Sequence, residues 1–275
     1  MPKAFVPLAG RPLLTYAVAT AAAAPGVVGV VLVVPDTHLD VTRPDWGGTA
    51  RASGEGSGRV LLAVPPHAAT AGSTVPDTTA PDTPQATMGD QATPDQTPRD
   101  RTTPDQRVRD RSMPDQRVRV SLVAGGAERS ASVAAGLAAL PPCELVLVHD
   151  AARCLTPVGV YQRVIAALRD GAQAVVPGMP VVDTIKVVND DEIVTATPPR
   201  GQLRAVQTPQ GFTRAALERA HASGKSATDD AALAEACGIP VRVVPGDALA
   251  HKVTTPPDLA AAERLVSSRT ALIDE

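Results

Sequence analysis

The stretch ELVLVHDAARCLTP, from Glu144 to Pro157, decides the fold. Its apolar run Leu145 to Val148 is short and rich in β-branched residues, which predicts a buried strand of a parallel sheet. The sequence turns polar directly after this run, and a helix is expected to follow the proline. His149, Asp150 and Arg153 are therefore predicted to lie where an open α/β sheet binds its ligands, beyond the carboxyl ends of the strands.

Asp150 and Arg153 are separated by two alanines and suit a phosphorylated, hydroxylated substrate. The carboxylate can accept hydrogen bonds from hydroxyl groups, and the guanidinium can bind a phosphate bidentately. The same two residues could instead form an ion pair at the end of the strand. From these residues alone, both interpretations stay open.

Composition favours a small-molecule partner. The 275 residues are 44% hydrophobic, which is enough for a substantial core, and the net charge of −3 provides no field that would attract nucleic acid or an anionic membrane. The aromatic content of 2% argues against a stacking platform for bases. No apolar stretch approaches the roughly 20 residues needed to span a bilayer. Cys143, Cys154 and Cys237 fit neither a disulfide framework nor a CxxC metal pair, so a cytoplasmic location is expected.

Helical and strand patterns alternate along most of the chain, which predicts a doubly wound α/β domain. A helix is expected at Pro12 to Ala24 and a strand at Val27 to Val34. Further strands are expected at 118–123, 174–182, 203–206, 208–212 and 241–244, and further helices at 129–140, 158–168 and 214–222, after 228–230 and after 256–257. A doubly wound domain usually opens with a strand, whereas this pattern opens with a helix.

The segment at about 37–117 interrupts this pattern. Apolar periodicity vanishes, except for a possible strand at Val60 to Val64, and the sequence TPDQTPRDR recurs with a period of ten residues. A ten-residue unit with one proline and alternating charges cannot bury a face of its own, so a disordered surface insertion is expected, with 67–116 the first site of proteolysis. Residues 99–119 hold seven arginines and four aspartates, which leaves contact with a polyanion as the alternative to a solvated linker.

Three further features are candidates for function. Gly125 and Gly126 open a helix whose first turn carries Arg129 and Ser132, a pattern that can bind phosphate or a nucleotide but also fits an ordinary tight turn. Lys252 lies at a strand-to-helix junction, where it is either a ligand contact or a solvated charge. Residues 183–195 resemble a hairpin with a turn at 189–191, an excursion typical of a dimerisation arm.

The motifs GGAERSASV, VHDAAR, DTIK, RAVQTPQGF, TDDA and HKVTTPPDL occur in this order, and through them the chain resembles the 2-C-methyl-D-erythritol 4-phosphate cytidylyltransferase family of the non-mevalonate isoprenoid pathway. The resemblance covers residues 2–34 and 118 to about 265. It implies a single Rossmann-like nucleotidyltransferase domain with a mostly parallel sheet and a protruding β-arm at about 183–204. It also implies a homodimer that exchanges these arms, and a reaction of CTP with methylerythritol phosphate that uses Mg²⁺ held mainly by the CTP phosphates.

The resemblance also implies roles for single residues. Gly126, Ala127, Ser132 and Ala151 would border the nucleotide. Asp150, Arg153 and Lys252 would hold methylerythritol phosphate in one subunit, while Thr184, Arg200 and Thr208 reach it from the partner's arm. Lys3, Arg200 and Lys252 would be the catalytic cations, with Arg200 and Lys252 positioning the attacking phosphate. No residue is expected to ligate metal directly.

Two departures from the family pattern bear on activity. The family opens with a strand and a glycine-rich loop of the form PAAGxGxR, which is not present here, so turnover by these 275 residues is expected to be severely reduced. Ala127 stands where the family often has a polar residue. A dimerising remnant without catalysis is therefore the alternative function. A sugar-nucleotide transferase of related fold would need an acidic DxD pair, which His149-Asp150-Ala151 does not supply.

Overall fold

The computed structural model describes residues 3–35, 59–64, 118–126 and 128–271, all of which belong to one unit of the chain. Residues 67–116, where a disordered segment was expected, lie outside the described residues. The possible strand at 60–64 does lie within them, and it is confirmed as β4 (Arg59–Val64). No helix in the described ranges combines the length and the apolar character that a membrane span requires.

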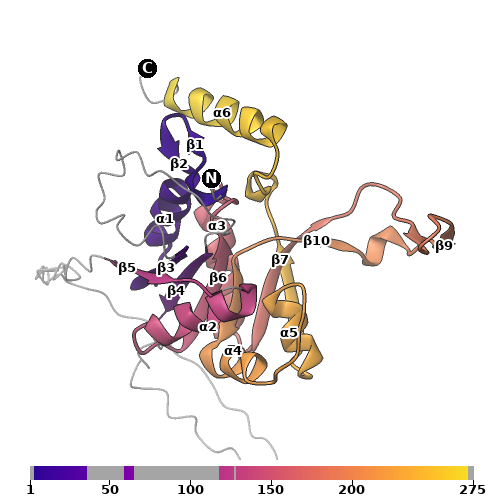
Figure 1. Cartoon of the computed structure of the whole chain (residues 1–275), viewed down its shortest axis with the longest axis horizontal. Coiled ribbons are helices and arrows are strands. Elements are labelled where there is room, and N and C mark those ends of the chain that lie inside the picture. Colours follow the sequence, from indigo (N-terminus) through magenta and orange to yellow (C-terminus); the bar gives the residue numbers. More distant parts are fainter. Residues whose placement is uncertain (1–2, 36–58, 65–117, 127, 272–275) are drawn as a thin grey trace, which may run out of the picture. The chain divides into compact units, whose positions relative to one another are not determined.

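The described residues build an eight-stranded sheet with the order β10-β7-β11-β6-β4-β3-β5, to which β12 adds by pairing with β7 (Figure 1). Its other strands are β3 (Gly29–Val34), β5 (Arg119–Ala124), β6 (Leu145–Asp150), β7 (Ala174–Pro180), β10 (Arg204–Val206), β11 (Gln210–Thr213) and β12 (Val241–Pro245). The predicted α/β class is confirmed, and each predicted strand is present within a few residues of its expected bounds.

Strand direction in this sheet is mixed. The pairings give β3, β5, β6, β7 and β12 one direction, and β4, β10 and β11 the opposite one. β4 lies between β3 and β6 and is antiparallel to both, with Arg59 opposite Asp150 and Val64 opposite Leu145. The strands that share a direction therefore do not all pair with one another, because β4 and β11 separate them. The prediction that Leu145 to Val148 has parallel neighbours is wrong, since β6 pairs antiparallel with both β4 and β11.

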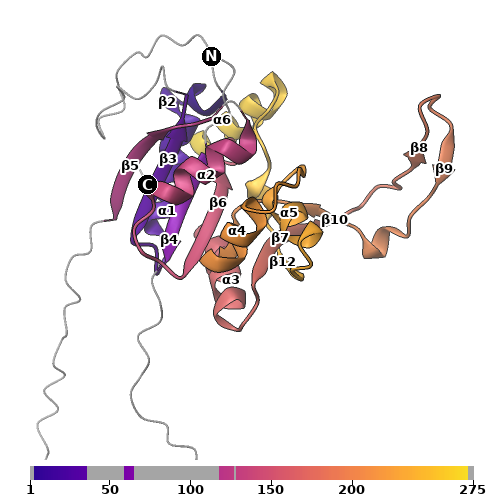
Figure 2. The ribbon, with the colours of Figure 1, turned by 60° about the horizontal axis from the view of Figure 1, so that its bottom comes forward.

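Helices cover both faces of the sheet. Packed against one face are α1 (Leu13–Ala23) and α3 (Val158–Arg169), and against the other α2 (Arg129–Ala139), α4 (Arg214–His221) and α5 (Asp230–Ala236) (Figure 2). Successive strand side chains point to opposite faces, so the fully apolar strands supply both cores at once. Leu145 and Leu147 of β6 join the α1 and α3 core, whereas Val146 and Val148 join the α2, α4 and α5 core.

A third apolar cluster lies beneath the last helix, α6 (Pro256–Ala271). There Leu8, from the short pair β1 (Pro7–Leu8) and β2 (Arg11–Pro12), and Leu13, the first residue of α1, meet Leu155, Val253 and Ala262. The short helices η1 (Lys3–Phe5) and η4 (Ala248–Ala250) precede β1 and α6 respectively. This cluster fixes the segment that carries Lys252 against the end of β6, since Val253 N–H donates to the Ala152 carbonyl at 2.8 Å.

The predicted hairpin is confirmed as β8 (Val187–Val188) paired antiparallel with β9 (Val194–Ala196), followed by η3 (Arg200–Gln202). Both strands are shorter than the sequence suggested. Asn189 closes the turn, because its side-chain oxygen accepts from the N–H groups of Asp191 at 3.2 Å and Ile193 at 2.9 Å. The hairpin projects away from the sheet (Figure 1) and exposes large apolar side chains, among them Ile193 at 63%.

Candidate functional site

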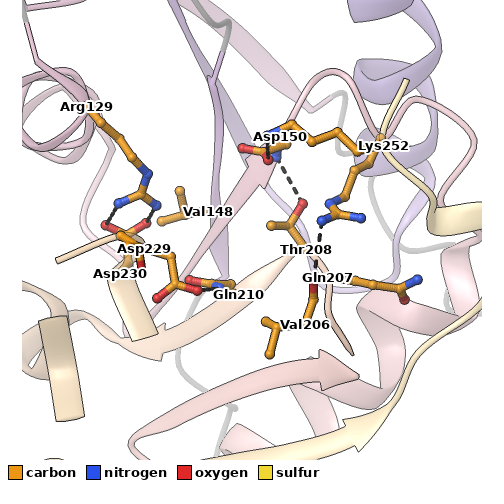
Figure 3. A pocket seen from close by; sticks show the side chains of 12 residues that line it. Arg129, Val148, Asp150, Val206, Gln207, Thr208, Gln210, Asp229, Asp230 and Lys252 are labelled. Atoms are coloured by element: carbon orange, nitrogen blue, oxygen red, sulfur yellow. Dashed lines mark hydrogen bonds and ion pairs between the residues drawn. The ribbon is translucent and has the colours of Figure 1, made fainter. Parts of the chain in front are cut away.

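A polar pocket of about 220 Å³ opens at the carboxyl end of β6 (Figure 3). Residues from β6, β11, the start of α2, the start of α5 and the segment before α6 converge on it. They are Arg129, Val148, Asp150, Arg153, Val206, Gln207, Thr208, Gln210, Thr228, Asp229, Asp230 and Lys252. The pocket brings together four of the predicted site residues, Asp150, Arg153, Thr208 and Lys252. The expectation that Thr208 reaches the site from a partner's arm is wrong, because its hydroxyl bonds the Asp150 N–H of its own chain.

Asp150 and Lys252 form an ion pair in this pocket, with Lys252 Nζ 3.0 Å from Asp150 Oδ2 (Figure 3). The Lys252 side chain is 41% exposed and the Asp150 side chain 15%, so the ammonium is the partner that faces solvent. Three ammonium protons are available, and one carboxylate contact leaves others to bind an anion. Lys252 is therefore placed at the pocket by a specific contact, while its ammonium also faces solvent.

The backbone beside Lys252 is held by a capping box at the start of α6. Asp258 accepts from the N–H groups of Thr254 and Thr255, both at 2.9 Å, and Thr255 Oγ1 accepts from Asp258 N–H at 3.4 Å. Such reciprocal bonds satisfy helix N–H groups that otherwise lack partners. The bonds from Thr254 and Thr255 hold the pKa of Asp258 well below its usual range. The path of the chain from Lys252 into the helix is thus fixed at both ends.

Arg153 lines the pocket but also ties three segments together. Its guanidinium donates to the Ala250 carbonyl at 2.8 Å and to the Val206 carbonyl at 3.3 Å. Burial lowers the pKa of Arg153, and the charge of Asp150 opposes that shift. The predicted phosphate clamp therefore coincides with a contact that joins the end of β6 to β10 and η4. The predicted alternative was an ion pair of Asp150 with Arg153, whereas the ion pair that the structure gives for Asp150 is with Lys252.

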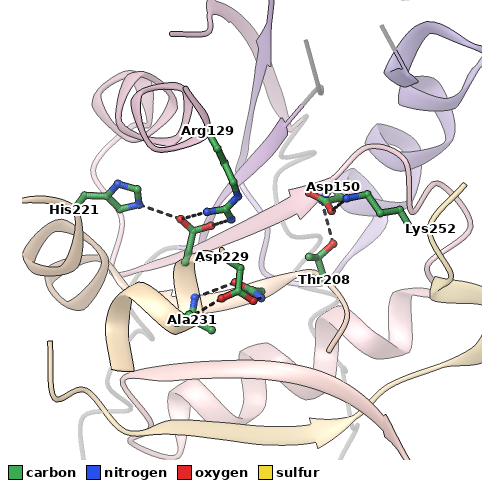
Figure 4. A network of polar contacts seen from close by, with 10 residues as sticks. Arg129, Asp150, Thr208, His221, Asp229, Ala231 and Lys252 are labelled. Carbon is green, nitrogen blue, oxygen red and sulfur yellow. Dashed lines mark hydrogen bonds and ion pairs between the residues drawn. The ribbon is translucent and has the colours of Figure 1, made fainter. Parts of the chain in front are cut away.

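Thr208 lines the pocket beside Asp150, and the buried His149 contacts it. Thr208 Oγ1 accepts from the Asp150 N–H at 3.0 Å (Figure 4) and lies 2.9 Å from Nδ1 of His149. The His149 side chain is completely buried, and its ring lies 5.4 Å from the Tyr161 ring, centroid to centroid. Burial lowers the pKa of His149 to about 4, although the charge of Asp150 raises it. The imidazole is therefore neutral at pH 7.

This buried imidazole predicts acid sensitivity. Because the folded-state pKa lies below the unfolded value of about 6.5, the unfolded chain binds more protons, and stability falls as pH drops from about 6.5 towards 4. The loss amounts to about 3 kcal/mol across that window. Urea unfolding at a series of pH values should show it. His149→Asn should flatten the curve between pH 6.5 and 4, and an unchanged slope would contradict the assignment.

A second buried network lies at the other side of the pocket (Figure 4). Asp230 is fully buried, accepts from both terminal nitrogens of Arg129, and is 3.0 Å from Nε2 of His221. Burial alone would raise the pKa of Asp230, but the hydrogen bonds from His221 and Arg129 outweigh it and the pKa is lowered. This one carboxylate therefore links α2, α4 and α5.

Asp229, the neighbour of Asp230, acts differently. Its side chain accepts from Ala232 N–H at 2.7 Å and so caps α5, which confirms the predicted cap. It also accepts from the amide of Gln210 at 2.7 Å, while the Gln210 oxygen accepts from Ala231 N–H at 3.1 Å. These bonds fasten β11 to the start of α5. Thr228 consequently faces the pocket from a fixed turn.

The glycine pair lies at the start of α2, beside Arg129. A Cβ on Gly126 would stand 2.4 Å from the Ala131 Cβ, so only glycine fits this close approach. Ser132 Oγ donates to the Gly126 carbonyl at 3.3 Å. Of the other predicted nucleotide contacts, Ala127 lies outside the described residues, and the methyl group of Ala151 is fully buried in the core.

The remaining predicted site residues lie away from this pocket within one chain. Thr184 and Arg200 are exposed on the arm, where Arg200 donates to the Val182 carbonyl at 2.9 Å. Lys3 is exposed in η1 and does not line the pocket. Sequence reasoning missed the lining residues Gln207, Gln210 and Thr228, whereas Arg129 was singled out with the glycine pair. The one signal of the missed residues was membership of the motifs RAVQTPQGF and TDDA.

An α/β sheet with cations and a carboxylate around a polar pocket beyond the carboxyl end of a strand is the arrangement in which open α/β folds bind ligands. The family model of 2-C-methyl-D-erythritol 4-phosphate cytidylyltransferase matches residues 102–268. The chain therefore belongs to this family.

Relatives in the same family are similar over part of the chain. The chain is 56% identical over 153 residues to the Nocardia farcinica 2-C-methyl-D-erythritol 4-phosphate cytidylyltransferase, which covers 56% of this chain and 66% of the relative. The Rhodococcus opacus enzyme of that name is 55% identical over 148 residues, again 66% of its length. The structure of 4-diphosphocytidyl-2C-methyl-D-erythritol synthase from Anaerococcus prevotii is 33% identical over 54% of this chain and 71% of that chain, with a TM-score of 0.51. The match thus spans just under two thirds of these curated relatives.

Proposed function

We propose that the protein transfers the cytidylyl group of CTP to 2-C-methyl-D-erythritol 4-phosphate, releasing pyrophosphate, in the non-mevalonate route to isoprenoid precursors. The observation that carries the proposal is the placement of Asp150, Lys252 and Thr208 around one pocket, with Lys252 Nζ 3.0 Å from Asp150 Oδ2. A carboxylate, a cation and a hydroxyl at one edge can hold a polyol and its phosphate together. Family membership supplies the substrates.

The chemistry needs cations more than acids. A phosphate monoester dianion is already a nucleophile: its oxygen forms the bond to the α-phosphorus of CTP, and the bond to pyrophosphate breaks. Catalysis then consists of aligning two polyanions and neutralising the charge that develops. Lys252, with its exposed ammonium, would position the attacking phosphate, and Asp150 would orient that ammonium as well as accept from substrate hydroxyls. Arg153 would contact the same substrate.

The nucleotide would lie at the other side of the pocket. Gly126 allows the close packing of the chain against Ala131 at the start of α2, and Ser132 and Arg129 lie in the adjoining first turn of that helix. Ala127 and Ala151 would contribute backbone contacts. Lys3 would act as a further cation near the triphosphate. These assignments follow the family motifs, and the position of Arg129 on the pocket wall supports them.

Magnesium would arrive on the CTP phosphates. Within the described residues no cluster of three or more His, Cys, Asp or Glu side chains could hold a metal ion, and Asp229 and Asp230 are already engaged in other bonds. Mg²⁺ commonly binds through substrate phosphates and water, with few protein ligands. A cytoplasmic location accords with the free thiols of Cys154 and Cys237.

Arm exchange between two copies would complete the site. Thr184 and Arg200 lie on the projecting arm rather than in the pocket of their own chain, so a partner's arm would bring them to it. The arm exposes Val182, Ile193 and Val194 at 76%, 63% and 52%, an apolar surface that a partner would cover. An isolated two-stranded ribbon is marginally stable in water, which also favours docking.

Deleting residues 184–198 should convert the homodimer into a monomer, because the apolar arm is lost. Light scattering coupled to size exclusion measures the change directly. Ile193→Ser with Val194→Ser should weaken the dimer while leaving the hairpin turn at Asn189 in place. Glu192→Ser is the matched control and should leave the dimer as strong as in the wild type. A dimer that survives the deletion would exclude arm exchange.

The activity test is pyrophosphate release by the 275-residue chain from CTP, methylerythritol phosphate and Mg²⁺, with mass spectrometry of the product. Release should require both substrates, and the product should be the cytidine diphosphate alcohol. Replacing CTP by UTP or ATP, or omitting the polyol phosphate, provides the controls. Failure of methylerythritol phosphate to bind in calorimetry, together with no pyrophosphate release, would contradict the proposal.

A further inference from the structure

The hydroxyl of Thr208 has two polar neighbours inside the protein as well as the pocket in front of it. It accepts from the Asp150 N–H at 3.0 Å and lies 2.9 Å from Nδ1 of His149. A hydroxyl has one proton to donate and two lone pairs that accept. The direction of the Thr208 proton therefore depends on whether Nδ1 of His149 donates or accepts.

The other ring nitrogen of His149 indicates where the imidazole proton lies. Nε2 is buried and has no hydrogen-bond partner in the part of the chain that the structure describes. A neutral imidazole carries one proton. The backbone groups of Arg153 and Thr208 also act on this ring, but neither meets the geometry of a hydrogen bond with Nε2, so a proton there would lack an acceptor. Orphaned buried N–H groups are rarer in folded proteins than acceptors with an unused lone pair. The proton is therefore better placed on Nδ1, the nitrogen that has a partner.

We infer that His149 is a positioning residue, which donates from Nδ1 to Thr208 and thereby turns the Thr208 hydroxyl proton into the pocket. With the Asp150 N–H and His149 Nδ1–H both donating, the two lone pairs of Thr208 are filled. The threonine proton then has its free direction towards a ligand. The preset donor suits an oxygen acceptor, and a phosphate oxygen most strongly, because hydrogen bonds to charged groups are the stronger ones.

This arrangement also strengthens the donor itself. Hydrogen bonds in a chain polarise one another, so a hydroxyl that accepts from two N–H groups donates more strongly. The ring cannot turn freely, since it is fully buried beside Tyr161. The neighbouring charges are Asp150, which lies on the same strand, and Arg153, which follows it. The inference rests on the proposed function only for the identity of the ligand.

The first test needs no ligand and no activity. Nitrogen-15 NMR of the free protein at pH 7 distinguishes a protonated from an unprotonated ring nitrogen for each of the five histidines. The His149 signals are those that disappear in His149→Asn. The expected result is a proton on Nδ1 and none on Nε2, and a proton on Nε2 would overturn the inference.

The second test asks whether the hydroxyl acts through His149. Calorimetric affinity for methylerythritol phosphate should fall about tenfold to a hundredfold in Thr208→Val and should be nearly unchanged in Thr208→Ser. His149→Leu should weaken binding to a similar extent, whereas His149→Asn should restore it, because the asparagine amide can donate from nearly the same place as Nδ1. Combining His149→Leu with Thr208→Val should add little.

Each result has a distinct meaning. Equal affinity of the wild type and His149→Leu would overturn the positioning role, as would full additivity of the two substitutions. Thermal melting identifies variants that fail to fold, and the NMR result on the wild type decides the inference even then. Absence of methylerythritol phosphate binding by the wild type would instead defeat the proposed substrate, while the ring spectrum still decides the role of His149.

Discussion

Replacing Lys252 by alanine is expected to lower turnover of CTP and methylerythritol phosphate by about 10²- to 10³-fold. The Lys252 ammonium lies 3.0 Å from Asp150. The backbone on both sides of Lys252 is held by the Val253 contact and by the α6 capping box, so the cation is in place before substrate binds. Preorganised charge at the reacting phosphate needs no rearrangement during the reaction. Its removal should therefore reduce kcat as well as raise KM for the polyol phosphate.

Initial-rate kinetics with pyrophosphate detection measure this effect, with Arg169→Ala as the control. Arg169 is an exposed cation at the end of α3 and does not line the pocket, so its loss changes net charge equally without touching the site. Asp150→Asn should give a smaller loss, because it leaves the ammonium in place without its orienting partner. Turnover by Lys252→Ala within threefold of the wild type would remove Lys252 from the mechanism.

Replacing Asp230 by alanine should destabilise the protein by about 3–5 kcal/mol. The carboxylate is fully buried and receives both Arg129 and His221, so its removal leaves buried donors without their partner. It would also separate α2 from α5 at the pocket wall. Chemical denaturation followed by circular dichroism gives the free energy of unfolding.

Asp229→Ala is the matched control for this experiment. It removes a carboxylate from the adjacent position, where the side chain caps α5 and binds Gln210 but is not part of the Arg129 pair. Loss of a helix cap typically costs about 1 kcal/mol. Equal destabilisation by the two substitutions would show that the buried contacts of Asp230 with Arg129 and His221 contribute no more to the free energy of unfolding than the Asp229 cap does.

Local sequence patterns predicted much of this fold and part of the site. The apolar runs that became β3 and β6 were identified because they are short and fully hydrophobic, and their alternate residues indeed divide between two cores. Asp150 and Lys252 were recognised because each follows a strand, and strand ends of one direction meet at one edge. The Asp229 cap was recognised from its position directly before a helical pattern.

Features set by long-range contacts could not be predicted in this way. The Arg129–Asp230 pair joins residues 101 positions apart, so Asp230 looked like an ordinary acid in a first helical turn. The run from Val60 to Val64 suggested a strand. Its place between β3 and β6 and its reversed direction depend on which strands pair with it, and the apolar pattern of the sequence does not identify those strands. The buried contact of His149 with Thr208 spans 59 positions and had no local signature.

The reversed direction of β4 decides at which edge of the sheet the connection between β4 and β5 begins and ends. Val64 ends β4 opposite Leu145, the first residue of β6, and Arg119 begins β5 opposite Gly29, the first residue of β3. Both ends of the connection between β4 and β5 are thus anchored at the edge of the sheet away from Asp150. A change of length between these two anchors would leave the strand ends beside Asp150 where they are.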